Sequence, residues 1–158
     1  MLSMPGQLPA VQVPPLLRTP VQPIYVGTPW HHPHPRHAGE KLGVWCHPGV
    51  AERFRWACDE AAEVSSWVPR RIDSYVRRTI RGTGRPSFHA VALAWDFYSL
   101  PWPQTVDVWG PHHAPDSAFA DVFYDAGFTL GRDFTRRKDW PHIEWSRGVA
   151  LGRGVLGH

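Results

Sequence analysis

Two short motifs contain residues that are able to bind a metal ion. In the first, SFHAVALAWD at 87–96, His89 and Asp96 lie near the two ends of an apolar stretch. In the second, DWPHIEW at 139–145, His142 lies beside carboxylates, 46 residues after Asp96. A buried histidine or aspartate without a partner costs free energy, and a metal ion satisfies both. Two histidines and one carboxylate form a three-ligand site that leaves a position open for water, which is typical of catalytic zinc. Zn²⁺ is therefore the predicted cofactor.

A carboxylate beside this predicted zinc site has the chemistry of a general base. Asp139 lies three residues before His142, where it is able to take a proton from a water molecule. Glu144 is an alternative candidate for this role. It lies two residues after His142, and strand side chains alternate, so the two side chains are expected on the same strand face. Both residues remain candidate bases at this point.

The elements that carry these residues are predicted from apolar patterning. The run FHAVALAWDFYSL at 88–100 lies between prolines and is typical of a buried strand, and HIEW at 142–145 predicts a short final strand. Side chains alternate along a strand, so two residues seven positions apart cannot share one face of an unbroken strand. His89 is therefore expected to precede the strand or to lie at a bulge.

Two helices and a further strand complete the predicted domain. Apolar residues spaced by three and four from Val50 predict a helix that ends before Pro69. The segment 71–82 predicts a strand that runs into an arginine-rich loop. A second helix is expected within 115–128, with Asp116 or Ser117 as its N-cap and Gly127 at its end. The order of elements favours an α+β fold with a small antiparallel sheet and helices packed on it.

The two ends of the chain have a different composition. Nine of the 17 prolines lie within the first 37 residues, which predicts an extended arm over 1–40 with no packed core of its own. The histidines of this arm, in PWHHPHPRH at 29–37, lack fixed geometry and are expected to bind metal adventitiously or not at all. The glycine-rich segment 149–158 predicts a flexible tail. The domain is thus expected to span 41–148.

Size and charge exclude several classes of protein. The 158 residues fit one domain, and no apolar run approaches the roughly 18 residues that a membrane span needs. The N-terminus has no apolar core of a secretory signal, so no signal peptide is expected. The net charge of +3 and the arginines clustered between 70 and 85 suit an anionic partner, either nucleic acid or cell-wall polymer. With only Lys41 and Lys138 as lysines, and with acids scattered among the arginines, nucleic acid is not the predicted partner.

Cys46 and Cys58 are expected to be free buried thiols.

Several segments together resemble a known enzyme family. SFHAVALAWDF at 87–97 is similar to the SxHxxGxAxD motif of the VanY-type zinc D-Ala-D-Ala carboxypeptidases and their L-Ala-D-Glu endopeptidase relatives. DWPHIEW at 139–145 resembles the second motif of that family. SYVRRTIRGTGRPSFH at 74–89 and FADVFYDAGFTLGRDF at 119–134 resemble the segments that precede the two motifs. The resemblance covers roughly residues 44 to 147.

The resemblance implies a hedgehog/DD-peptidase fold and a role for each matching residue. The implied zinc ligands are His89, Asp96 and His142. Asp139 would be the base, Arg78 would stabilise the developing oxyanion, and Ser87 and Tyr75 would bind substrate. The sequence departs from the pattern at Ala92, where the family usually has glycine, a residue that lets the backbone bulge.

The predicted function is therefore a zinc peptidase that cleaves stem peptides of bacterial peptidoglycan, as a carboxypeptidase or an endopeptidase. The alternative is a catalytically weak or inactive cell-wall-binding virion protein that keeps the fold, which the alanine in place of glycine favours. Without a signal peptide, such a protein suits a phage lysin or a tail-associated hydrolase, made in the host cytoplasm and acting at the cell wall. In the tail case, the proline-rich arm is expected to bind other tail proteins.

Overall fold

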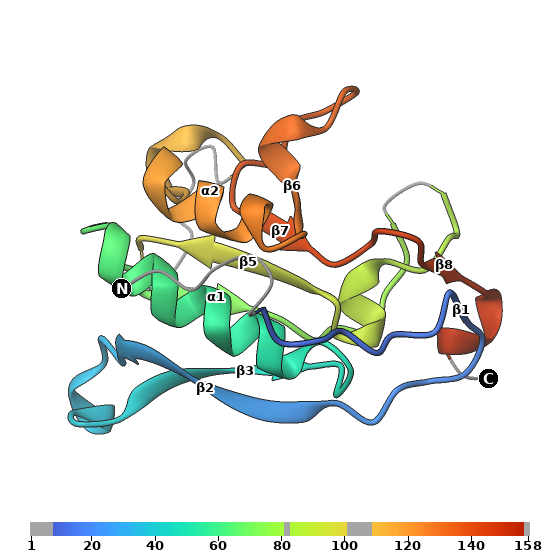
Figure 1. The fold of residues 1–158 in the computed structure, drawn as a ribbon, viewed down its shortest axis with the longest axis horizontal. Coiled ribbons are helices and arrows are strands. Elements are labelled where there is room, and N and C mark those ends of the chain that lie inside the picture. Colours follow the sequence, from blue (N-terminus) through green and yellow to red (C-terminus); the bar gives the residue numbers. More distant parts are fainter. Residues whose placement is uncertain (1–7, 81–82, 101–108, 157–158) are drawn as a thin grey trace.

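The computed structural model describes residues 8–80, 83–100 and 109–156 (Figure 1). Within these ranges it contains two α-helices and small, mostly antiparallel sheets, which confirms the predicted α+β class. The helices are α1 (Ala51–Val64) and α2 (Ser117–Asp125). The largest sheet has the order β4-β5-β7-β6 and consists of β4 (Arg71–Asp73), β5 (Ala94–Tyr98), β7 (His142–Glu144) and β6 (Thr129–Leu130). The hedgehog/DD-peptidase arrangement stays a prediction.

The four-stranded sheet is antiparallel throughout, and β5 lies inside it. Asp96 is the register partner of Asp73 on β4 and of His142 on β7. Side chains alternate along the strand, so Trp95 and Phe97 are fully buried in the core while Asp96 lies on the opposite face. The sheet thus separates an aromatic core from a polar face.

Both predicted helices are confirmed. α1 buries Phe54, Ala57, Cys58 and Ala61 on one face, at the spacing of three and four that predicts it. α2 begins after Asp116, whose side chain accepts a hydrogen bond from the Phe119 amide. Gly127 follows α2 with a φ of +99°, a left-handed conformation that glycine adopts without strain.

Aromatic rings fill the core between the helices and the sheet. Phe54 of α1 lies 4.3 Å from Trp95 of β5, measured between ring centroids, and 6.0 Å from Phe123 of α2. Phe128, which leads into β6, contacts Trp95 and Phe123 from the other side. This cluster makes β5 a rigid support for the residues on its polar face.

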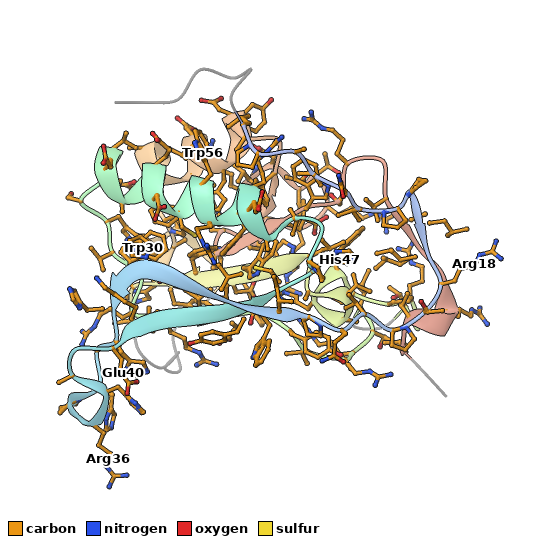
Figure 2. The ribbon with its side chains drawn as sticks, turned by 60° about the horizontal axis from the view of Figure 1, so that its bottom comes forward. Arg18, Trp30, Arg36, Glu40, His47 and Trp56 are labelled. Carbon is orange, nitrogen blue, oxygen red and sulfur yellow. The ribbon has the colours of Figure 1, made fainter. Side chains whose placement is uncertain are left out.

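The N-terminal region is not the extended arm that the prolines predicted. Residues Ile24–His31 form β2 and Lys41–Cys46 form β3, and the two strands pair as an antiparallel hairpin that crosses the predicted domain boundary at 40 (Figure 1). β2 contacts α1, and Trp30 points into the core, where it stacks on Phe119 at 5.3 Å. Arg36 and Glu40 lie at the projecting tip of the hairpin (Figure 2). Val26, Thr28 and Trp30 alternate as the buried positions of β2, and Pro29 is tolerated because it lies where the register is irregular.

The predicted flexible tail is also ordered over its described part. β8 (Ala150–Leu151) pairs in parallel with β1 (Leu16–Leu17), and Val155 is fully buried. Backbone hydrogen bonds hold this glycine-rich segment in place, because the Ala150 and Gly152 amides donate to carbonyls of the N-terminal segment. The first seven residues of the predicted arm and the last two of the tail lie outside the described residues.

The strands predicted at 71–82 and 88–100 are shorter than expected. Only Arg71–Asp73 of the first is a strand, and residues 81 and 82 lie outside the described ranges. The second begins with the 3₁₀ helix η3 (Phe88–Val91) before β5. The other 3₁₀ segments are η2 (Pro35–His37), η4 (Pro111–His113), η5 (Gly131–Asp133) and η6 (Arg153–Leu156). Across the described ranges, no helix is both long and apolar enough to cross a membrane.

Candidate metal centre

Strand register brings Asp96 and His142 together. The two residues are direct partners in the β5–β7 ladder, and opposite side chains on one face of an antiparallel pair lie close to one another. The Oδ1 atom of Asp96 lies 3.0 Å from Nδ1 of His142. Both side chains are largely buried, at 14% and 10% exposure. Residues 46 positions apart are therefore adjacent because the final strand returns beside β5.

His89 precedes the strand, as the alternation of strand side chains requires. It lies in η3, whose first turn is capped by Ser87, because the Ser87 hydroxyl accepts a hydrogen bond from the His89 amide at 3.2 Å. Ala92 ends η3 in the left-handed region, with φ 55° and ψ 39°, and turns the chain into β5. Ala92 thus adopts a conformation that is ordinarily favoured by glycine, and His89 lies beside Asp96.

One ring nitrogen of His89 contacts a backbone carbonyl, and the other faces the carboxylate of Asp96. Nδ1 lies 2.8 Å from the backbone carbonyl of Ser74, which sets the orientation of the ring. Nε2 lies 3.3 Å from Oδ2 of Asp96 without hydrogen-bond geometry, so it is a buried polar atom that has no hydrogen-bond partner among the described residues. A buried unpaired nitrogen is costly, and a metal ion is a partner that removes this cost.

The donor set fits a divalent metal ion. Ligand atoms of His89, Asp96 and His142 lie within 4.8 Å of one another, and this is the one such group in the described part of the chain. His89 Nε2 and His142 Nδ1 approach the two different oxygens of Asp96. Imidazole and carboxylate donors suit zinc and other divalent ions.

His142 is held by carboxylates at both nitrogens. Its Nε2 donates to Oε1 of Glu144 at 2.6 Å, since Glu144 lies two residues along β7 on the same strand face. Burial opposes a charge on the ring, yet the hydrogen bonds to Asp96 and Glu144 outweigh it and raise the pKa of His142 to about 10. We call the three side chains of His89, Asp96 and His142 the metal group. Because Glu144 accepts a hydrogen bond from Nε2 of His142, Nδ1 is the nitrogen of His142 that faces the other two residues of this group. Carboxylate–histidine pairs of this kind orient the histidine ligands of metal sites.

The two aspartates of the centre have opposite electrostatics. Burial favours the neutral form of Asp96, but contacts with His142 and His89 hold the pKa of its carboxyl far below the usual range. Burial and then the charge of Asp96 raise the pKa of the Asp139 carboxyl above its ordinary value. A lowered pKa favours the anionic form of Asp96, which suits a cation, and Asp139 is the stronger base of the two.

Asp139 lies beside the metal group on a tight turn. Its Oδ2 is 3.9 Å from Nδ1 of His142, and its Oδ1 is buried without a hydrogen-bond partner in the described residues. The His142 amide donates to the Asp139 carbonyl, and the Asp139 amide donates to the carbonyl of Gly131. A Cβ atom at Gly131 would lie 2.0 Å from the Asp139 carbonyl oxygen, so only glycine permits this packing.

A cavity of about 710 Å³ opens onto these residues, within the size range of ligand sites. Among the predicted site residues, Arg78 and Ser87 line it together with the metal group and Asp139. Tyr75 is half-buried and is not among the described residues that line it. Ser87 is already engaged in capping η3, so its contact with substrate stays a prediction.

Several contributors to the site were missed by the sequence reasoning. The carbonyl of Ser74 orients His89, and no pattern in the sequence identifies a backbone acceptor. Glu144 was considered only as a base, although its spacing of two from His142 on a strand was the signal for a direct contact. Trp109 and Arg137 line the cavity from segments in which no motif was identified, and Phe134 lines it from the end of the segment 119–134.

The histidines near the tip of the β2–β3 hairpin do not form a comparable group. Nδ1 of His32 and Nδ1 of His34 accept hydrogen bonds from backbone amides two residues ahead. His37 pairs with Glu40 at 2.9 Å, and both side chains are exposed. These contacts give the histidines local turn roles.

Comparisons of the chain with protein-family models, with curated proteins and with solved structures each give no match.

Proposed function

We propose that this protein is a zinc-dependent peptidase that cleaves peptide bonds in bacterial peptidoglycan. The observation that carries the proposal is the convergence of His89 and His142 on the two oxygens of Asp96, with Asp139 beside them in one cavity. The same residues carry the resemblance to the VanY-type carboxypeptidases and endopeptidases. Geometry and motif thus support the same ligand set.

The metal is expected to be held by His89, Asp96 and His142. A bound zinc ion would polarise a peptide carbonyl and lower the pKa of a water molecule in the cavity. The protein supplies the orientation of the ligands, through Ser74 on His89 and Glu144 on His142.

Asp139 is the base in this proposal. Its buried Oδ1 atom has no hydrogen-bond partner among the described residues, and its raised pKa favours accepting a proton from water. Glu144 is the weaker candidate because its Oε1 already accepts the His142 Nε2 proton at 2.6 Å. The exposed guanidinium of Arg78 lines the same cavity and is suited to stabilise negative charge that develops on the substrate carbonyl oxygen.

The proposal includes delivery of the enzyme to the wall by a phage. The proposal includes two versions of this delivery, a lysin and a tail-associated hydrolase. The docking role proposed for the proline-rich segment is confined to residues before β2, because β2 itself packs on α1. Within the described ranges these residues are 8–23, of which Leu16–Leu17 pair with β8.

Turnover of wall peptides tests the proposed function. Zinc-loaded wild type is incubated with purified peptidoglycan and with a synthetic stem peptide, and released D-Ala and new amino termini are quantified. Asp139→Asn is the matched variant, because it keeps the three ligands and removes the base. The expected result is hydrolysis by wild type that falls by about 10²–10⁴-fold in the variant. Equal rates for the two proteins, or no hydrolysis by wild type, would contradict the proposal.

A further inference from the structure

Charges of opposite sign line the inner and outer parts of the candidate site. Asp96, Asp139 and Glu144 surround the buried metal group. Arg78 and Arg137 line the same cavity, but their side chains are exposed, so they lie toward its mouth. A substrate therefore meets cations before it reaches the metal group.

Neither Arg78 nor Arg137 forms an ion pair with a carboxylate of the described residues. Two other arginines do have carboxylate partners, since Arg71 pairs with Asp73 and Arg132 pairs with Asp121. Over the ranges that the structure describes, no carboxylate lies within 4.0 Å of the guanidinium of Arg78 or Arg137. Two unpaired guanidinium groups at one cavity mouth make a site for an anion.

Arg137 is held in place by an aromatic ring. Its guanidinium lies over the indole of Trp109, 4.6 Å from the ring centroid. Stacking of this kind restrains the plane of the guanidinium and leaves the N–H groups at its edge available to a carboxylate. The Trp109 carbonyl accepts a hydrogen bond from the Trp140 amide, between Asp139 and His142. The position of Arg137 is thus tied to the metal group.

We propose that Arg137 determines specificity by binding a free carboxylate of the substrate at the mouth of the cavity. The substrates are then acidic peptides, in which a carboxylate lies close to the bond that is cleaved, in preference to peptides with amidated carboxyl groups. This inference rests on the proposed peptidase function, of which it names the substrate class. An exposed ion pair gives a modest effect, so the preference for acid over amide is roughly fivefold.

The test uses two stem peptides that differ only in their carboxyl groups, which are free in one peptide and carboxamides in the other. Wild type, Arg137→Gln and the control Arg136→Gln are compared, because Arg136 is an exposed neighbour that does not line the cavity among the described residues. Wild type and Arg136→Gln are expected to favour the free acid, through KM, by roughly fivefold at low salt and less at high salt. Arg137→Gln is expected to lose this preference while its kcat is retained.

Binding measurements separate this inference from the proposed function. Both peptides are titrated calorimetrically into each zinc-loaded protein. Tighter binding of the acid that Arg137→Gln abolishes, without hydrolysis of either peptide, would overturn the peptidase proposal and support the carboxylate site. Hydrolysis of both peptides at equal kcat/KM, or an unchanged preference in Arg137→Gln, would overturn the carboxylate site alone. No binding and no hydrolysis of either peptide would overturn both.

Discussion

In the proposed zinc site, the contact between Glu144 and His142 is expected to influence metal affinity, although Glu144 is not one of the three ligands. Oε1 of Glu144 accepts the Nε2 proton of His142 at 2.6 Å and so leaves Nδ1 beside Asp96. This arrangement fixes the ring and increases the basicity of the nitrogen that faces the metal group.

Replacing Glu144 by glutamine is expected to weaken zinc binding by about 10–100-fold, because the neutral amide supports the ligand less strongly than a carboxylate does. Competition with a chromophoric chelator measures the affinity. Asp139→Asn serves as the control and is expected to keep near-wild-type affinity. Equal zinc affinity in wild type and Glu144→Gln would show that the contact has no part in binding.

The two cysteines give the protein a pH-dependent stability that is independent of the metal centre. Cys46 of β3 and Cys58 of α1 are free and fully buried, as predicted. Burial raises the pKa of both thiols well above the ordinary value, and the neighbouring Cys46 and Asp59 raise that of Cys58 further. Both groups therefore stay protonated in the folded protein when the unfolded chain loses those protons.

Stability is expected to fall above about pH 8.5, where thiols of the unfolded chain ionise, and to be unaffected by them below it. The unfolded state then binds fewer protons than the folded state, so each thiol reduces the free energy of unfolding by about 1.4 kcal/mol per pH unit. Urea unfolding between pH 7 and 10 measures the slope. The double variant Cys46→Ala, Cys58→Ala is expected to show a shallower decline, and an unchanged slope would contradict the thiol origin.

At the scale of elements, the link between η3 and β5 decides whether His89 reaches Asp96. Ala92 makes this link in the left-handed region, at φ 55°, and is fully buried. A non-glycine residue in that conformation costs about 1–2 kcal/mol. Ala92 therefore turns the chain from η3 into β5 at the expense of some strain.

Ala92→Gly is expected to stay within about 1 kcal/mol of wild type, because relief of strain is offset by the lost methyl group and the more flexible unfolded chain. Ala92→Val is expected to destabilise by more than about 2 kcal/mol, because a β-branched residue fits neither the conformation nor the packed site. Urea unfolding compares the three proteins. A valine variant as stable as wild type would show that residue 92 is not left-handed.

The C-terminal elements are integral to the fold, since Val155 is buried and β8 pairs with β1. Val155→Ala is expected to lower the free energy of unfolding by about 1–3 kcal/mol through loss of buried apolar surface. Arg153→Ala, an exposed change in the same 3₁₀ segment, is expected to alter it by less than about 0.5 kcal/mol. Thermal unfolding measures both. Equal stability of the two variants would indicate that the segment is not packed.

Across the whole molecule, elements with a local sequence pattern were predicted, and elements that depend on long-range pairing were not. Local periodicity was sufficient for α1 and α2, and parity was sufficient to place His89 before β5. The β2–β3 hairpin was not predicted because the high proline content of the first 37 residues indicated an extended arm. The alternation of buried and exposed residues on β2 depends on its packing against α1, which no local pattern reports. Pairing of β1 with β8 joins segments over 130 residues apart, and no local pattern reports it.

In the candidate site, the ligands were predicted and the contacts that orient them were not. The ligand set of His89, Asp96 and His142 was predicted by motif, and the structure brings the three together in a group that is able to hold a metal ion. The contacts that orient them were not predicted, because they depend on strand register and on backbone carbonyls such as that of Ser74. The resemblance implied that Tyr75 binds substrate, but Tyr75 is not among the described residues that line the cavity, whereas the backbone carbonyl of the neighbouring Ser74 contacts His89.

The central claim is that one zinc ion is bound by His89, Asp96 and His142. Elemental analysis of purified wild type and His89→Ala, after identical exposure to zinc and desalting, tests it most directly. The expected result is about one zinc per wild-type chain and close to none in the variant, since two ligands hold the ion too weakly to survive desalting. Zinc that is absent from wild type, or equally abundant in His89→Ala, would contradict the assignment of the site.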